Sequence, residues 1–340
     1  MQFTREQIKD FLIDEGFTVK EKSSRGELIF NSPFDSSDTK RRCGINYKKN
    51  GRWNCYLSGE NSKNFIDFIK KIKGFESRFE AKIFFLKNYL LITDLKKYFE
   101  TQSFEYSEEE TERSKIELPE DQYIRLTESN QDSIELKKYF DYLHKRHIDN
   151  KLIFDLKIFA DLYDQRVLFP FYENSGELTF YTARSILEGD FLPWKNLSGA
   201  RNGLVYNIEN IEAGSTVFIF EAIFDCLMVY PRGVATLGRK LDSVQMEAIL
   251  ARAPYKIVVV NDGDSYGQES QKETAARFAA VHDNVFIFDW QTFYFENQKF
   301  SDCKDFNKLG LIAGDIIHKY IKRWDNKTKL KLDFLRKIGR

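Results

Sequence analysis

Apolar and polar positions alternate in a regular way between residues 213 and 290. Short apolar runs of the kind that form buried strands occur at 217–220, 233–237, 256–260 and 284–288. Helical spacing of apolar residues predicts helices between them, at 224–230, 243–252 and 268–281. Because strands and helices that alternate along a chain form right-handed crossovers, this pattern predicts an α/β fold with a mostly parallel sheet.

Four acidic residues lie at or beyond the ends of these predicted strands. Glu221 follows the first strand directly, Asp262 and Asp264 follow the third in VVVNDGDSYGQ, and Asp305 lies in the loop after the fourth. Ligands of such sheets collect beyond the carboxyl ends of the strands. Carboxylates held close together are unfavourable unless a cation or proton neutralises them, so the set predicts a Mg²⁺ or Mn²⁺ site. NDGDSYG taken alone also fits an Asx turn in which Asp262 and Asp264 cap the next helix.

Charge is balanced over the whole chain but not along it. The 52 basic residues equal the 52 acidic ones, whereas residues 1–100 carry 20 Lys and Arg against 14 Asp and Glu. Residues 105–121 hold eight acids and two bases with almost no apolar periodicity, which predicts a linker. The last residues, 318–340, are basic with interspersed apolar positions and predict a helical tail for a partner, for nucleic acid or for packing.

Several classes of protein are disfavoured. No apolar run approaches the roughly 18 residues that span a bilayer, and the N-terminus lacks the apolar core of a signal peptide. We therefore expect a cytoplasmic protein that does not associate with a membrane. The four cysteines are scattered, which indicates reduced thiols. The sequence contains no Gly-x-x-x-x-Gly-Lys-Ser/Thr stretch, so we expect no P-loop helicase within it.

Three stretches in order resemble the signatures of a Toprim domain: FEAIFDCL from residue 220, NDGDSYG from 261 and KDFNKLG from 304. The resemblance covers about 100 residues. It implies that Glu221 is an acid/base or metal-linked group and that Asp262, Asp264 and Asp305 bind Mg²⁺ or Mn²⁺. Asp225 and Asn307 match secondary polar positions of the same motifs.

Upstream stretches resemble the catalytic core of DnaG-type primases. Residues 166–185, RVLFPFYENSGELTFYTARS, are two apolar runs joined by a turn with glycine and by themselves predict a hairpin. PWKNLSGARNGLVYN follows at 193–207. The resemblance implies that Arg184, Lys195 and Arg201 line a groove beside the metal site and hold nucleotide phosphates and template. It also assigns substrate or DNA contacts to Arg166, Lys304 and Asn307.

Residues 31–76 follow the outline of the primase zinc ribbon, but only Cys55 of its four ligand positions is kept. Ser32, Asp35 and Ser58 stand at the others. Serine is a poor zinc ligand, so we expect a ribbon without zinc. Aromatic packing would then hold the former site, through Phe34, Trp53, Tyr56, Phe65 and Phe68. The alternative is a salvaged site that uses Asp35, Cys43 and Cys55.

Together the patterns predict a Toprim parallel-sheet domain preceded by a mixed α+β primase core subdomain and a small ribbon-like domain. The expected segments are the degenerate ribbon-like, template-binding domain at 1–100, the acidic linker at 101–121, the primase core subdomain at 122–212, the Toprim domain at 213–312 and the basic helical tail at 313–340.

The resemblance implies a bacteriophage-like DNA primase. Such an enzyme makes short RNA primers from NTPs on single-stranded DNA with two bound metal ions, and its expected partner is a separate hexameric helicase. A phage-encoded enzyme would work in the bacterial host cytoplasm. Two alternatives remain open. One is a Toprim nuclease, which would not need Arg184, Lys195 or the ribbon, and the other is a non-catalytic nucleic-acid-binding replication subunit.

Overall fold

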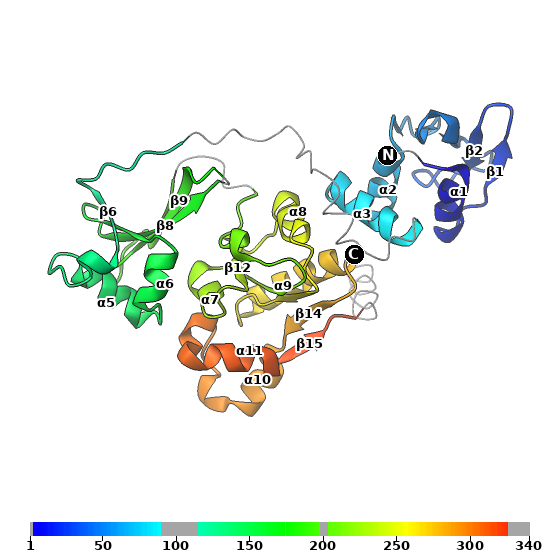
Figure 1. Cartoon of the computed structure of the whole chain (residues 1–340). Coiled ribbons are helices and arrows are strands. Elements are labelled where there is room, and N and C mark those ends of the chain that lie inside the picture. The colour runs from blue at the N-terminus through cyan, green and yellow to red at the C-terminus, as the bar shows by residue number, and fades with distance from the viewer. Residues whose placement is uncertain (1–2, 90–114, 174, 198–202, 326–340) are drawn as a thin grey trace. The chain divides into compact units, whose positions relative to one another are not determined.

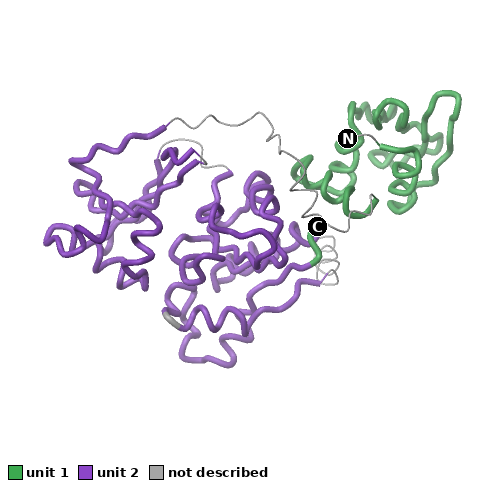
Figure 2. Tube along the Cα trace, in the orientation of Figure 1, with its two compact units in different colours: residues 1–102, 280–283 green, residues 103–279, 284–340 purple. Residues whose placement is uncertain are grey.

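The chain divides into two compact units in a computed structural model that describes residues 3–89, 115–173, 175–197 and 203–325. The first unit comprises residues 1–102 with 280–283, and the second comprises 103–279 with 284–340 (Figure 2). The finer predicted division at residues 122, 213 and 313 stays a prediction. In the described ranges, no helix combines the length and apolar character needed to cross a lipid bilayer.

The described residues of the first unit pack three helices with a five-stranded antiparallel meander (Figure 1). Its helices are α1 (Arg5–Asp14), α2 (Phe65–Lys73) and α3 (Arg78–Tyr89). The strands, in sheet order, are β1 (Lys20–Lys22), β2 (Glu27–Phe30), β3 (Cys43–Asn46), β4 (Arg52–Cys55) and β5 (Asn61–Ser62). Alternate residues of β2, β3 and β4 are buried, so one face of the sheet supplies the core.

Aromatic side chains fill that core. Trp53 packs edge-on against Phe68 with 5.2 Å between ring centroids, and Phe34 lies 5.8 Å from Trp53. The predicted aromatic packing of the ribbon is therefore confirmed for Phe34, Trp53, Phe65 and Phe68, which contact one another. It is wrong for Tyr56, whose side chain is 77% exposed. Tyr56 directly follows β4, where the alternation of buried positions directs it away from the core.

A buried carboxylate organises the loop between β2 and β3, where a zinc ribbon has ligands. Asp38 accepts hydrogen bonds from the backbone N–H groups of Ser32 (2.7 Å), Lys40 (2.9 Å) and Arg42 (2.9 Å). Burial raises the pKa of Asp38, but these donors outweigh it and the pKa lies below its ordinary value. The thiol of Cys55 donates to the Ser32 hydroxyl at 2.9 Å. Hydrogen bonds from the backbone to the Asp38 carboxylate thus hold the loop together.

The other former ligand positions are spread out. Ser58 is exposed, and the Asp35 carboxylate accepts from the backbone and hydroxyl of Ser37 at 2.8 and 2.6 Å. The alternative set of Asp35, Cys43 and Cys55 does not form a metal-holding group within the described residues.

The second unit contains two sheets. The first is antiparallel with the order β10-β9-β8-β7-β6 and comprises β6 (Tyr123–Arg125), β7 (Phe159–Asp161), β8 (Arg166–Tyr172), β9 (Leu178–Ser185) and β10 (Trp194–Asn196). Helices α5 (Lys137–Lys145) and α6 (Asn150–Asp155) accompany it. The predicted hairpin over 166–185 is confirmed, because β8 and β9 pair antiparallel from Arg166–Ser185 onward.

The second sheet has the order β12-β11-β13-β14-β15, and its first four strands run parallel. They are β11 (Thr216–Phe220), β12 (Gly233–Ala235), β13 (Lys256–Val259) and β14 (Val285–Phe288). Its helices are α7 (Ile223–Leu227), α8 (Ser243–Ala251), α9 (Ser265–Ala279), α10 (Trp290–Glu296) and α11 (Ala313–Lys319). The predicted alternation of strands and helices is confirmed, with bounds that differ by a few residues.

The predicted helical tail differs from the structure. After α11, residues Ile321–Arg323 form β15, which pairs antiparallel with β14 at the edge of the sheet. Apolar residues in a short segment fit a helix or a strand equally well, and the open edge of β14 decides for the strand here. Residues 326–340 of the predicted tail and 101–114 of the predicted linker lie outside the described residues.

One hydrophobic core joins both sheets of the second unit. It runs from Leu126 and Phe169 of the first sheet's region to Phe220, Val258 and Phe288 of the second. Five short 3₁₀ helices complete the described fold: η1 (Tyr47–Lys49), η2 (Glu128–Asn130), η3 (Ile208–Asn210), η4 (Gln298–Phe300) and η5 (Phe306–Ile312). Because the core is continuous, residues of the antiparallel sheet can contribute to a site at the parallel sheet.

Removal of the Asp38 carboxylate should loosen the β2–β3 loop. In Asp38→Ala, the amides of Ser32, Lys40 and Arg42 lose their acceptor, and we expect their hydrogen exchange to accelerate by roughly tenfold. Exchange mass spectrometry of the full chain measures this on peptides covering 31–42. Asp35→Ala is the matched control, since its carboxylate bonds only Ser37, and equal acceleration in both variants would contradict the assigned role of Asp38.

Candidate active site

The carboxyl ends of three parallel strands meet at one edge of the second sheet. β11 and β13 are neighbours with Ile219 opposite Val259, and the backbone N–H of Val260 donates to Ile219 at 2.8 Å. On the other side of β11, the N–H of Thr236, just after β12, donates to the carbonyl of Phe220 at 3.0 Å. Glu221 and the Asp262–Asp264 loop therefore leave the sheet side by side, as the strand pattern predicted.

The carboxylate of Asp262 interacts electrostatically with several other acids. Burial raises its pKa to about 7, and the negative charges of four further acids add to the shift. These are Asp225, Glu221, Asp305 and Asp264. All four predicted metal-binding acids are therefore near enough for their charges to interact, together with Asp225. Such mutual repulsion is typical of a site that receives a cation.

Glu221 has one oxygen without a partner. Its Oε1 forms an ion pair with Nε of Arg239 at 3.4 Å, whereas Oε2 is buried and accepts no hydrogen bond. Burial raises the pKa of Glu221, and the Arg239 charge opposes this. A buried carboxylate oxygen without a donor is unfavourable by itself, and it is the donor that a hard divalent cation requires.

The remaining acids have found internal partners. Asp264 accepts at Oδ1 from the backbone N–H of Gly267 at 2.7 Å and so caps α9, while Asp305 pairs with Lys308 at 2.7 Å. The interpretation of NDGDSYG as a helix cap is therefore confirmed for Asp264, and its metal-binding role stays a prediction. As placed, no three His, Cys, Asp or Glu side chains of the described residues converge on one point that could hold an ion.

The donor set still fits Mg²⁺ or Mn²⁺ chemically. It consists of carboxylate oxygens only, and one of them, Oε2 of Glu221, is buried and accepts no hydrogen bond. The other acids and burial raise the pKa of Asp262, so a positive ion would stabilise its charged form. Glu221, Asp262, Asp264 and Asp305 are the residues that would hold the ions.

Two glycines make the aspartate loop possible. A Cβ on Gly263 would lie 2.0 Å from the Tyr294 hydroxyl, and one on Gly267 would lie 2.3 Å from the Asp262 carbonyl oxygen. The N–H of Gly263 also donates to the carbonyl of Lys304 at 2.8 Å, which ties this loop to the Asp305 loop.

Asp225 and Asn307 connect the site to its surroundings. Asp225 is 6% exposed and accepts from the backbone N–H of Asn307 at 2.5 Å. Burial raises its pKa to about 7, with the Asn307 N–H and Arg146 opposing and Asp305 adding. The Asn307 amide donates to the carbonyl of Arg146 at 2.9 Å. Asn307 is therefore buried and fully engaged inside the protein, which differs from its predicted contact with substrate or DNA.

Two aromatic rings, Trp194 of β10 and Tyr142 of α5, contact Phe224, the residue before Asp225, at 5.7 and 6.2 Å between centroids. Arg184 lies 5.3 Å from the Trp194 ring and donates to the Tyr142 hydroxyl at 3.3 Å. Arg146 lies 5.0 Å from the ring of Phe224 itself. No sequence pattern pointed to Arg146, which ends α5 among other basic residues. Only its contacts with Phe224 and Asn307 identify it as part of the site.

Lys195 and Arg166 form ion pairs with other acids. The β9–β10 register sets Arg184 opposite Trp194 and Lys195 opposite Ala183, so Arg184 and Lys195 occupy opposite faces of the sheet. Lys195 pairs with Asp164 at 2.5 Å, and its predicted contact with substrate or DNA stays a prediction. Arg166 is 7% exposed and binds Asp190 at 2.9 Å, so it holds the 186–193 loop. Lys304 is exposed beside Asp305, and Arg201 lies outside the described residues.

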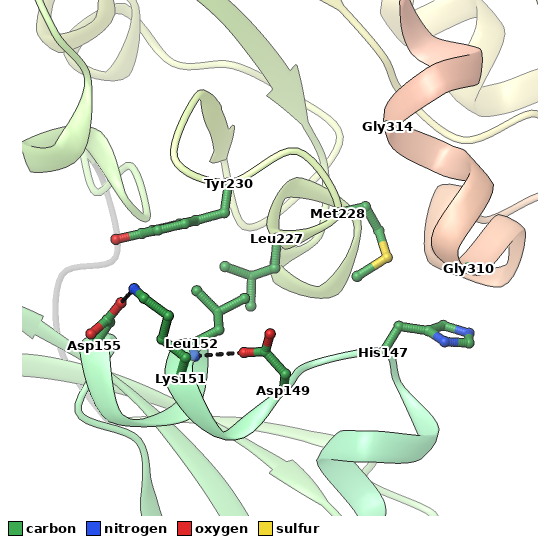
Figure 3. A pocket seen from close by; sticks show the side chains of 10 residues that line it. All are labelled: His147, Asp149, Lys151, Leu152, Asp155, Leu227, Met228, Tyr230, Gly310 and Gly314. Carbon is green, nitrogen blue, oxygen red and sulfur yellow. Dashed lines mark hydrogen bonds and ion pairs between the residues drawn. The ribbon is translucent and has the colours of Figure 1, made fainter.

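A cavity of about 320 Å³ lies next to the site but does not include its acids. Figure 3 shows Tyr230 and Leu227 at one end and His147 and Met228 at the other. Asn307 touches its wall, since its amide lies 3.4 Å from the sulfur of Met228. The chemistry of the acids is therefore separate from this cavity.

Comparison with known proteins gives only distant likenesses. No protein-family model matches the sequence, and no curated protein matches it. Among solved structures, the zinc-binding and RNA polymerase domains of the Aquifex aeolicus primase share 19% identity over 87% of this chain and 81% of that chain, with a TM-score of 0.34. The RNA polymerase domain of Mycobacterium tuberculosis primase DnaG shares 13% over 56% and 78%, with 0.41. The E. coli primase catalytic core shares 14% over 51% and 74%, with 0.40. At these scores the likeness decides neither family nor function.

Neutralising Asp262 should stabilise the metal-free protein. Its folded-state pKa of about 7 exceeds the ordinary 3.8, so the folded state keeps a proton that the unfolded state loses between about pH 4 and 7, and stability falls as pH rises through that window. In Asp262→Asn at pH 8 with chelator, we expect the free energy of unfolding to rise by about 1–2 kcal/mol, a value reduced for partial solvent exposure.

Urea denaturation between pH 4 and 8 measures this effect. Asp302→Asn is the matched control, because Asp302 is an exposed acid of the neighbouring loop and should leave the pH profile unchanged. Wild-type-like pH dependence of Asp262→Asn would contradict the clustering of charge around Asp262.

The close backbone approach at Gly267 should make it intolerant of any side chain. Gly267→Ala places a Cβ against the Asp262 carbonyl, and we expect a loss of at least about 2 kcal/mol in the free energy of unfolding. Gly314→Ala in α11 is the control, since its nearest neighbour is 4.0 Å away, and it should be neutral or slightly stabilising. Urea denaturation at pH 7 compares the two, and equal stability of both variants would contradict the predicted clash.

Proposed function

We propose that this chain is a DNA primase, a nucleotidyltransferase that makes short RNA primers on single-stranded DNA. The observation that carries the proposal is the set of carboxylates at the carboxyl ends of the parallel strands, with the unpaired Oε2 of Glu221 and the raised pKa of Asp262. The Toprim-like motifs around these acids and the primase-like stretches before them agree with it.

The acids would bind divalent cations, and each has a part that follows from its surroundings. Asp262 and Glu221 would hold the ions from adjacent strand ends, and Asp305 would complete the set from the loop that Gly263 ties down. When bound, Mg²⁺ or Mn²⁺ supplies charge that aligns a 3′-hydroxyl with the α-phosphate of an NTP and stabilises the pyrophosphate that leaves.

Basic side chains beside the acids would orient the nucleotide and the template. Arg184 and Arg146 are held by the aromatic rings of Trp194 and Phe224, so their guanidinium groups are positioned before a ligand arrives. A guanidinium forms paired, charge-assisted hydrogen bonds to phosphate oxygens. These two arginines favour polymerisation over plain hydrolysis, because an incoming NTP brings a triphosphate that needs such partners.

A priming assay tests the proposal. The full chain is incubated with long single-stranded DNA of mixed sequence, the four NTPs and Mg²⁺ or Mn²⁺, and labelled products are separated by size. We expect short oligoribonucleotides, and a loss of at least roughly 10³-fold in Asp262→Ala, since removal of a metal-binding acid removes the transition-state charge stabilisation. The matched control is Asp302→Ala, which should retain wild-type synthesis.

The other outcomes separate the alternatives. Cleaved DNA without RNA synthesis would identify a Toprim-type nuclease, and binding without either reaction would identify a non-catalytic subunit. Addition of a hexameric replicative helicase that raises primer yield would support the proposed partner. Primer synthesis that is unchanged in Asp262→Ala would contradict the assignment of the site.

A further inference from the structure

A basic residue outside the motifs lies directly at the acid cluster. Arg239 follows β12 in the loop that leads to α8, and its guanidinium forms the 3.4 Å ion pair with Glu221. The same guanidinium lies 5.5 Å from the ring centroid of Tyr266, near the start of α9. The Arg239 side chain is 51% exposed, whereas that of Glu221 is 17% exposed. Arg239 thus reaches from solvent to the acid that has an unpaired oxygen.

The backbone around Arg239 is fixed, so only its side chain is free to move. The Thr236 hydroxyl donates to the carbonyls of Phe220 (3.2 Å) and Gly238 (2.9 Å), and the Ser270 hydroxyl donates to the carbonyl of Arg239. Asp242 ends the loop as the cap of α8, with its carboxylate on the N–H of Gln245 at 2.8 Å. A change in the position of the guanidinium therefore requires rotation of the side chain and no rearrangement of the loop.

Both contacts of the guanidinium are weak. A half-exposed ion pair at 3.4 Å gains little, and a cation–π contact at an exposed tyrosine gains little more. The guanidinium also leaves Oε2 of Glu221 without a hydrogen bond. By contrast, a phosphate group accepts paired, charge-assisted hydrogen bonds from arginine, and a divalent cation satisfies a carboxylate more fully than one distant guanidinium does.

We propose that Arg239 is a positioning residue with two partners. In the unloaded protein it serves as the counter-charge of Glu221. When divalent cations occupy the acids, it turns by side-chain rotation to the triphosphate oxygens of the incoming nucleotide. The identity of this ligand rests on the proposed function, whereas the competition between Arg239 and a cation for Glu221 does not.

Lys240 provides a matched comparison. It is the next residue, it is exposed, and it carries the same charge, but no ion pair or hydrogen bond joins its side chain to another residue that the structure describes. Long-range electrostatics would make the two residues equivalent, whereas the specific contact with Glu221 makes them different. Lys240→Ala therefore separates a local role of Arg239 from a general effect of positive charge.

Two binding measurements on the full chain test the inference without catalysis. Titration calorimetry measures the affinity for Mn²⁺ alone, and then the affinity for inorganic tripolyphosphate in saturating Mg²⁺. In Arg239→Ala we expect Mn²⁺ to bind about fivefold more tightly, because a competing charge is gone, and tripolyphosphate to bind roughly tenfold more weakly. Lys240→Ala should change either affinity by less than about twofold.

Arg239→Lys and thermal denaturation complete the test. Lysine keeps the charge but not the planar fork, so we expect wild-type Mn²⁺ affinity and only partial recovery of tripolyphosphate binding. Unchanged melting temperatures would exclude a folding defect. The inference is overturned if Arg239→Ala leaves both affinities unchanged, weakens Mn²⁺ binding, or matches Lys240→Ala. If the binding of Mn²⁺ and tripolyphosphate depends on Arg239 but the protein makes no oligoribonucleotides, the proposed function is contradicted and the inference about Arg239 is retained.

Discussion

Repulsion among carboxylates determines how the acids at the strand ends of the second unit are protonated and paired. The negative charges of five acids near the ends of β11 and β13 repel one another, so each charge must be neutralised or paired. Burial holds protons on Asp225 and Asp262 up to about pH 7, whereas Asp264 turns to the N-terminus of α9 and Asp305 to Lys308. A continuous hydrophobic core, which includes Phe218, Phe220 and Val258 on one face of the sheet, helps to hold the strand ends together.

Contacts between segments that are distant in sequence give the site its rigidity. Asn307 joins the loop of Asp305 to Asp225 in α7 and to the carbonyl of Arg146 after α5, and the Gly263–Lys304 hydrogen bond joins the two acidic loops. Through these links the antiparallel sheet contributes cations and aromatic rings beside acids of the parallel sheet.

In the first unit, a buried carboxylate organises a loop through hydrogen bonds to the backbone. In a zinc ribbon, bonds to the metal hold the loops. Here Asp38 accepts hydrogen bonds from three backbone N–H groups, and the Cys55 thiol donates a hydrogen bond to the Ser32 hydroxyl. The aromatic core around Trp53 and Phe68 supplies the burial that such a small unit requires. A carboxylate thus takes on a structural role in one unit, while in the other unit we propose that carboxylates bind a cation.

Local patterns were sufficient to predict the parallel sheet, the hairpin and the acids at strand ends, because apolar periodicity and strand direction are properties of neighbouring residues. They were insufficient wherever the interaction partner of a side chain lies far away in the sequence. Strand register set Lys195 on the face opposite Arg184, and burial turned Asn307 into an internal link. Arg146 and Arg239 joined the site only through contacts across the fold. Periodicity is encoded within a few residues, but the register, burial and partner of a side chain depend on packing of the whole unit, which no short stretch of sequence contains.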